Sequence, residues 1–205
     1  ASGKAMWYIN PKDGEKYTAD AEVNGRPVTY SRNKANETII GSAEPKAYGG
    51  INSSLSWKNL TLDLGFTYSL GGQTYDALEV YNADDGLYRV YMQTKYYYDN
   101  RWTPEHTDAL YPIRVYDAVT AKGYQSRKLH PGDYLRLKNA SLSYNLPKGA
   151  LSKANISNMR VFATGTNVFT WSAFGLYDPE RNIYGTTSWA VPQCKTYTVG
   201  VELTF

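Results

Sequence analysis

Thr196-Tyr-Thr-Val-Gly-Val-Glu-Leu-Thr-Phe205 is the stretch of sequence on which the fold prediction rests. Apolar side chains alternate along it with polar or small ones, which is the two-residue period of a β-strand. A transmembrane barrel strand has about 9–11 residues, with lipid on one side and a polar lumen on the other. The stretch therefore favours a barrel strand over a strand of a soluble sandwich. Its apolar face carries Tyr197, Val199, Val201, Leu203 and Phe205.

Four earlier stretches show the same alternation. Leu60 to Leu70 alternates for eleven residues without a break, and Gly71-Gly72 ends it. We expect strands near residues 47–57, 60–70, 134–146, 158–168 and 196–205.

The connections between these strands alternate in length. Residues 1–46, 71–132 and 169–195 are long connections, whereas Lys58-Asn59 and residues 147–157 are short ones. Outer-membrane barrels have short periplasmic turns and long extracellular loops. The pattern predicts that the long connections, beginning with the loop region 1–46, are extracellular and that the chain ends at the periplasmic rim.

Two elements are expected inside the long connections. Residues 21–23 and 28–30 flank Asn24-Gly25, a favoured sequence for the turn of a β-hairpin. Asp84-Asp85-Gly86 is expected to begin a short helix that runs to Lys95, with an acidic side chain as its N-cap.

Composition excludes several classes of protein. The net charge is only +3 and no basic block stands out, which argues against nucleic acid as a partner. No apolar run approaches the roughly 18 residues of a transmembrane helix. The N-terminal residues lack the apolar region of a signal peptide, which fits an unexported protein or an internal or processed piece of a longer one.

Candidate catalytic and metal-binding residues are few. We expect His106 and His130 to be solvated loop residues and Cys194 to be a buried or interfacial thiol. Asp178-Pro179-Glu180 is interpreted as a turn or loop-packing element rather than a calcium site, because the spacing of ligands does not match one. The sequence therefore predicts no catalytic residue, metal site or cofactor.

Aromatic residues in the long connections are the candidate ligand contacts. Tyrosine supplies 20 of the 30 aromatic residues, and its apolar ring and polar tip suit sugar or peptide ligands. The same rings also suit packing between loops or against a protein lid. The candidates are Tyr96, Tyr97, Tyr98, Trp102, Tyr177, Tyr184 and Trp189.

The C-terminal 160 residues resemble the SusC/RagA family of TonB-dependent (TonB-linked) outer-membrane transporters. Each matching stretch is weak alone, but their common order is specific. The stretches are residues 40–52, Thr67-Tyr-Ser-Leu-Gly-Gly72, Asn100-Arg-Trp-Thr-Pro104, Gly132-Asp-Tyr-Leu-Arg-Leu-Lys-Asn-Ala-Ser-Leu-Ser-Tyr144, Thr166-Asn167 with Thr170-Trp171, Tyr177-Asp-Pro-Glu180, and the ending Thr196 to Phe205.

The resemblance implies a specific fold class and function. The chain is expected to be all-β, its antiparallel strands forming the C-terminal section of a 22-stranded transmembrane β-barrel. Such transporters import glycans or oligopeptides with a SusD-like surface lipoprotein, and TonB-ExbB-ExbD acts through an N-terminal plug. Five strands cannot close that barrel, so the chain is expected to be a fragment that needs the remaining barrel strands and outer-membrane lipid.

The resemblance also implies a role for the terminal strand. Its last aromatic residue, Phe205, is similar to the signal that barrel-assembly machinery recognises in such proteins, together with the apolar face of Tyr197, Val199, Val201 and Leu203. The alternative to a transporter section is a soluble β-rich carbohydrate-binding module, and a hydrolase ranks third.

Overall fold

The computed structural model describes residues 2–9, 18–35, 37–118, 120, 122–147, 156–181 and 185–205. These residues form two compact units, one made of Ala1–Gly41 with Asp76–Leu129, and the other of Ser42–Tyr75 with His130–Phe205. Among the described residues, no helix combines the length and the apolar character needed to cross a bilayer.

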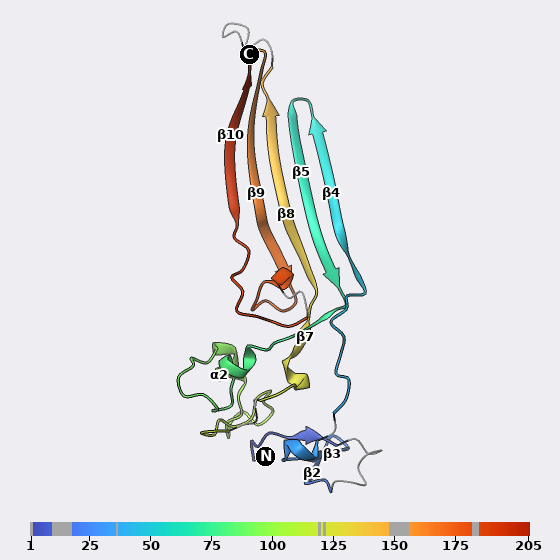
Figure 1. Ribbon diagram of the computed structural model, residues 1–205, viewed down its shortest axis with the longest axis vertical. Coiled ribbons are helices and arrows are strands. Elements are labelled where there is room, and N and C mark those ends of the chain that lie inside the picture. Colours follow the sequence, from blue (N-terminus) through green and yellow to red (C-terminus); the bar gives the residue numbers. More distant parts are fainter. Residues whose placement is uncertain are drawn as a thin grey trace. The chain divides into compact units, whose positions relative to one another are not determined.

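The second unit is built on one five-stranded antiparallel sheet (Figure 1). This arrangement confirms the predicted all-β, antiparallel fold class. Neighbouring strands follow each other along the chain, so the order across the sheet is β10-β9-β8-β5-β4. The strands are β4 (Ala47–Trp57), β5 (Leu60–Leu70), β8 (Tyr134–Asn145), β9 (Asn158–Ser172) and β10 (Thr196–Thr204).

The register of the sheet places most apolar residues of all five strands on one face. Residues opposite each other in an antiparallel pair project to the same side. One such row runs through Leu55, Leu62, Leu142, Ala163 and Val199. Leu62, Leu64, Phe66, Val201 and Leu203 therefore lie on one common surface.

The apolar face has the height of a membrane band. Every second residue of β5 from Leu60 to Leu70 is apolar, which spans about 34 Å along the strand and about 26 Å at a tilt of roughly 40°. Outer-membrane barrels present an outward apolar band about 25 Å tall. Many side chains on this face are exposed, including Ile51 at 57% and Val199 at 78%. Within the described part of the unit, no second sheet packs on this face.

Strand β9 is longer than predicted, because it continues past residue 168 to Ser172. Asn167 adopts a left-handed φ of 53°, and the register between β8 and β9 shifts at this point. The shift marks a bulge, after which pairing resumes between Leu137 and Phe169. Sequence alternation is lost at a bulge, which is why the pattern ends too early.

The first unit contains short elements and the predicted hairpin. The strands β2 (Ala21–Val23) and β3 (Arg26–Thr29) pair across a two-residue turn, in which Asn24 and Gly25 have φ values of 51° and 74°. Two left-handed residues define the turn that hairpins favour, which explains the Asn-Gly sequence. The remaining elements of the chain are β1 (Trp7–Tyr8), η2 (Arg32–Lys34), α1 (Glu79–Asn82), α2 (Lys95–Asn100), η3 (Ser126–Lys128), η5 (Pro179–Arg181) and the paired strands β6 (Gln73–Tyr75) and β7 (Leu129–Pro131).

The predicted helix from Asp84 to Lys95 is wrong. Helix α1 ends before this segment and α2 begins at its last residue, with Thr94 as its N-cap. Asp85 and Gly86 have φ values of 54° and 109°, which no α-helix contains. The Asp84 carboxylate accepts hydrogen bonds from the N–H groups of Gly86 and Tyr88 at 2.9 and 2.6 Å, so it caps a turn instead of a helix.

Gly86 is predicted to be indispensable to this turn. A Cβ atom at Gly86 would lie 2.1 Å from the Val115 carbonyl oxygen, whereas at Gly25 nothing lies within 4 Å of that position. Gly86→Ala should therefore displace the backbone of residues 84–88 and raise their amide hydrogen exchange by at least tenfold. Gly25→Ala adds only the strain of a left-handed alanine, about 1 kcal/mol. Equal exchange in the two variants would contradict the packing of Gly86 against residue 115.

Candidate functional site

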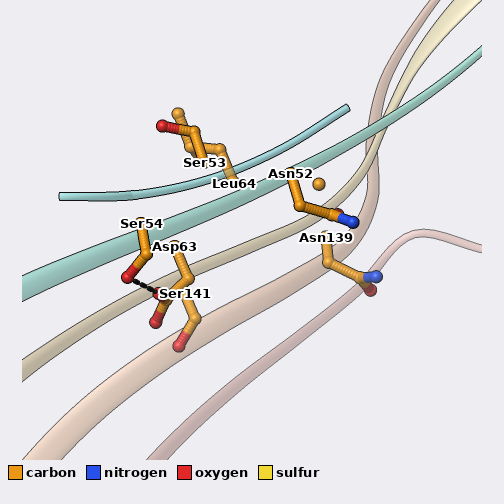
Figure 2. A pocket seen from close by; sticks show the side chains of 8 residues that line it. Asn52, Ser53, Ser54, Asp63, Leu64, Asn139 and Ser141 are labelled. Carbon is orange, nitrogen blue, oxygen red and sulfur yellow. Dashed lines mark hydrogen bonds between the residues drawn. The ribbon is translucent and has the colours of Figure 1, made fainter. Parts of the chain in front are cut away.

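The polar face of the sheet holds a shallow, open depression lined by amide, hydroxyl and carboxylate groups (Figure 2). Asn52, Ser54, Asp63, Asn139 and Ser141 present their side chains on this face. Ser54 Oγ donates to Asp63 Oδ1 at 2.6 Å. In a barrel, this face lines the lumen.

A largely buried cluster of charged and polar side chains lies on the same polar face and joins the sheet to the loop between β9 and β10. We call it the clasp and define it as Thr67, Arg136, Lys138, Asp178, Glu180 and Gln193. Arg136 is 3% exposed, and its guanidinium donates to Asp178 at 2.5 Å and to Glu180 at 3.1 Å. Lys138 Nζ lies 2.6 Å from Glu180. The charges of loop and sheet are therefore complementary, and those of Arg136, Asp178 and Glu180 are largely shielded from water, whereas Lys138 is 33% exposed.

Neutral groups complete the clasp. Thr67 on β5 donates to Glu180 at 2.8 Å. Gln193, near the other end of the loop, donates its backbone N–H to Asp178 at 2.8 Å and its side-chain amide to Glu180 at 2.9 Å. Both ends of the loop thus bind each other as well as the sheet. This satisfies most acceptor positions of the two carboxylates, which is the condition for a buried ion pair to be tolerated.

The local sequence accounts for this geometry. Asp178 accepts a hydrogen bond from the backbone N–H of Glu180 at 3.1 Å, and Pro179 begins the short helix η5 between them. The turn points both acidic side chains in the same general direction. The predicted turn or loop-packing role of Asp178-Pro179-Glu180 is confirmed by these contacts.

Side chains at the bulges of the sheet make additional hydrogen bonds to the loop. Lys138 is the extra residue of β8 at the register shift, so Lys138 and Asn139 both reach the polar face. Asn167 is in the corresponding bulge of β9, and its side chain donates to the Cys194 carbonyl oxygen at 3.1 Å. Each irregularity in the ladder therefore presents a side chain that holds the loop.

The pKa values of the clasp carboxylates are lowered. Burial by itself raises the pKa of Asp178, but hydrogen bonds from Gln193 and Arg136 outweigh burial, and the net shift is downward. For Glu180, burial is again opposed by hydrogen bonds, here from Lys138 and Thr67, and its pKa is also lowered. Both groups are therefore ionised at neutral pH.

The first unit has a charged core of its own. Asp84 and Asp85 are fully buried. Arg127 donates to both oxygens of Asp85 at 2.7 and 3.3 Å and lies over the Tyr111 ring. Tyr111 packs edge-on against Tyr97 at 5.0 Å. Burial raises the pKa of Tyr97 to about 12 and also raises that of Tyr111, so both remain neutral hydroxyls.

In the first unit, some of the aromatic residues predicted to contact a ligand are buried and others are exposed. Tyr97 is only 1% exposed, so it is a core residue and not a ligand contact in this structure. Trp102 is half-buried and lies against Gly3. Tyr96 and Tyr98 are 50% and 62% exposed on the same unit, and the Arg101 guanidinium lies over the Tyr98 ring.

The other predicted contacts belong to the second unit. Trp189 is 70% exposed, whereas Tyr177 is half-buried beside Phe174. Tyr184 lies outside the described residues. Among the predicted contacts, Tyr96, Tyr98 and Trp189 are therefore the side chains that are exposed enough to meet a ligand or another protein.

Two sequence expectations require correction. Cys194 is exposed, so the buried setting expected for this thiol is wrong, whereas the interfacial setting stays a prediction. His130 is not simply a solvated loop residue, since its ring stacks on Phe174 at 4.1 Å and is half-buried. Stacking between segments distant in sequence leaves no local pattern from which it can be predicted.

The terminal strand keeps its predicted apolar face exposed. Tyr197, Val199, Val201 and Leu203 are 44–78% exposed, and Phe205 is 82% exposed. β10 pairs with β9, and Glu202 projects to the polar side opposite Arg160. Phe205 lies at the same end of the sheet as the β4–β5 turn (Figure 1).

The fold and both faces of the sheet define a section of a β-barrel wall, with an apolar outer side and a polar inner side that binds a returning loop. No protein-family model matches the chain. The chain is similar to the TonB-dependent receptors P3 and P26 of Formosa agariphila, at 30% identity over 94% of the chain and 29% over 82%. It spans about a fifth of the length of these relatives, 19% and 18%.

Solved structures show the same likeness. The RagAB peptide transporter matches over 100% of this chain, with a TM-score of 0.78 and 26% identity, and this chain covers 21% of it. The RagAB peptide importer in its 'open-open' state matches with a TM-score of 0.73 and 25% identity. Together with the receptors, these matches confirm the resemblance to the SusC/RagA type of TonB-dependent receptor.

The lowered pKa values predict how the clasp depends on pH. A carboxylate with a lowered pKa in the folded state contributes stability above its unfolded pKa, about 4, and loses it as pH falls through the folded value. Asp178→Asn/Glu180→Gln should therefore lower the melting temperature of the detergent-solubilised protein at pH 7, and this difference should shrink toward pH 3.

A matched control is the exposed pair of Arg160 and Glu202, which are 3.7 Å apart. Glu202→Gln should change the melting temperature little at either pH, because exposed ion pairs contribute about 0–1 kcal/mol. A difference for the clasp variant that is as large at pH 3 as at pH 7 would show that charge does not hold the loop.

Proposed function

We propose that this chain is the C-terminal barrel section of an outer-membrane TonB-dependent nutrient importer. The observation that carries the proposal is the single sheet with one continuous exposed apolar face and one polar face. A soluble protein would cover such a face with a second layer, because exposed apolar patches of this size are rare on soluble monomers. A barrel wall needs no cover, since lipid contacts it.

The proposal includes further strands beyond the five described ones. In the described sheet, β4 pairs only with β5 and β10 only with β9, so two edges present unpaired backbone groups. Such edges are not tolerated in the hydrocarbon layer. The relatives are about five times as long as this chain, which is enough for the rest of a wall and an N-terminal plug. Transport is proposed for that complete protein and not for the five strands alone.

The proposed partners follow from the same likeness. The complete protein would act with a SusD-like surface lipoprotein, and TonB-ExbB-ExbD would deliver energy through the plug. The exposed aromatic and apolar side chains of the first unit, among them Tyr96, Tyr98 and Met92 at 90% exposure, suit a protein or substrate contact. The proposed substrates are oligosaccharides or oligopeptides. The complete protein would transport them and not act on them as an enzyme.

The terminal strand is proposed to serve assembly. Its exposed residues Tyr197, Val199, Val201, Leu203 and Phe205 form an accessible apolar row at the edge of the sheet. An unpaired edge can accept another strand by backbone hydrogen bonding. In the complete barrel this edge pairs with the first strand.

Two neighbouring residues of β10 provide the sharpest test of the membrane proposal. Val199 and Thr198 are both exposed, near the middle of the strand, and lie on opposite faces. Val199→Lys places a charge in lipid, which costs about 2–4 kcal/mol near the middle of the bilayer, whereas Thr198→Lys places it in the lumen. We expect Val199→Lys to reduce the folded fraction in outer-membrane preparations of the complete protein and Thr198→Lys to leave it nearly unchanged.

A soluble module gives the opposite result. Both lysines would then point into water, both variants would fold equally well, and the purified chain would need no detergent. Glycan binding by the chain in detergent-free buffer, measured by calorimetry, would favour that alternative. Loss of growth on one polymeric nutrient after deletion of the complete gene would identify what is imported.

A further inference from the structure

We propose that the described part of the loop between β9 and β10, residues 178–181 and 185–193, is a fixed strap across the polar face of the sheet. It narrows the lumen permanently and does not open as a gate. The inference rests on the proposed function in one respect, namely that the polar face lines a transport path. The attachment of the strap to the sheet is observed within the second unit and does not depend on the proposed function.

The strap is attached at three separate places. The clasp joins Asp178, Glu180 and Gln193 to β5 and β8. The bulge residue Asn167 of β9 holds the Cys194 carbonyl group immediately after it. A mobile lid is expected to have few buried contacts and exposed backbone hydrogen bonds. The clasp gives the strap buried contacts, whereas the hydrogen bond from Asn167 to the Cys194 carbonyl group is exposed.

The third attachment lies in the middle of the strap. Gly185 and Thr187 exchange backbone hydrogen bonds with Tyr75 of β6, at 2.7 and 2.9 Å, and Thr187 is 3% exposed. Gly185 has a φ of 66° and lies against Ala43, where an added Cβ atom would be 2.2 Å from the alanine methyl group. The backbone therefore meets the neighbouring segment too closely to admit a larger residue.

The chemistry of the clasp keeps the strap closed throughout the physiological pH range. Opening would expose two carboxylates on the strap and leave Arg136 and Lys138 on the wall without their partners. The side chains of Arg136, Asp178 and Glu180 are 3%, 6% and 11% exposed, so their attraction is little screened by water or salt. Breaking a buried pair costs far more than breaking an exposed one.

A fixed strap has a consequence for the transport path. The depression on the same polar face is lined by the neutral side chains of Asn52, Asn139 and Ser141 and by the carboxylate of Asp63. Because Arg136 and Lys138 are engaged by the strap, neither is available to attract an anionic substrate. The strap therefore narrows the free cross-section and pairs with two of the cationic side chains on this side of the lumen.

The first experiment is hydrogen exchange, measured by mass spectrometry on the complete transporter in detergent. In the wild type, peptides that contain the Thr187 and Gln193 amides should be protected, and adding a nutrient extract should leave their protection unchanged. Arg136→Met should raise their exchange at least 100-fold. Arg160→Met, which breaks the exposed pair with Glu202, should change it less than threefold. Fast exchange in the wild type, or protection lost when nutrient is added, would overturn the fixed strap.

The second experiment locks the strap covalently. Thr67→Cys/Glu180→Cys in a Cys194→Ser background places one thiol on β5 and one on the strap, at two positions whose native side chains are hydrogen-bonded at 2.8 Å. Bridging them with a short bis-maleimide should leave the rate of nutrient uptake within twofold of the unbridged variant. Abolished uptake after bridging would show that the strap must move. If the unbridged variant and the wild type both lack uptake, the transport proposal fails, and the exchange experiment still decides whether the strap is fixed.

Discussion

Backbone hydrogen bonding between neighbouring strands is the constraint on which the rest of this structure depends. The antiparallel ladders fix which residues lie opposite each other, and opposite residues share a face. A shift of one residue in any ladder would move the apolar side chains of that strand to the polar face. The continuous rows from β4 to β10 show that all four ladders are in the register that keeps the faces separate.

The irregular points of the ladders are as informative as the regular ones. The bulges at Lys138 and Asn167 interrupt alternation and turn two polar side chains toward the returning loop. Regular pairing supplies the wall, and its interruptions supply the attachment points for the segment that crosses the polar face. Wall and strap are therefore joined by a small number of residues, most of them charged or amide-bearing, and water is largely excluded from Arg136, Asp178 and Glu180 among them.

The long connection in the first unit is stabilised in a different way from the sheet. It has few regular elements, yet it must satisfy its backbone groups and bury enough surface to hold a shape. Buried carboxylates accomplish part of this, since Asp84 caps backbone N–H groups and Asp85 binds Arg127. Tyr97 and Tyr111 supply the apolar contact. The exposed neighbours Tyr96 and Tyr98 are thereby held on a folded base and remain accessible.

The sequence by itself determined the approximate positions of the strands and the composition of the two faces, because the two-residue period is a local property of stretches such as Leu60 to Leu70 and Thr196 to Phe205. It also determined the Asn24-Gly25 turn, whose left-handed residues are a local property. Only the tertiary structure decided that Asp178 and Glu180 bind Arg136 and Lys138, although complementary charges in Gly132 to Tyr144 and in the loop were a readable signal. It also decided that Tyr97 is buried while Tyr98 is exposed, and that Asp85 and Gly86 turn the chain instead of continuing a helix. These outcomes depend on contacts between residues about 10 to 40 positions apart in sequence, and no local period encodes such contacts.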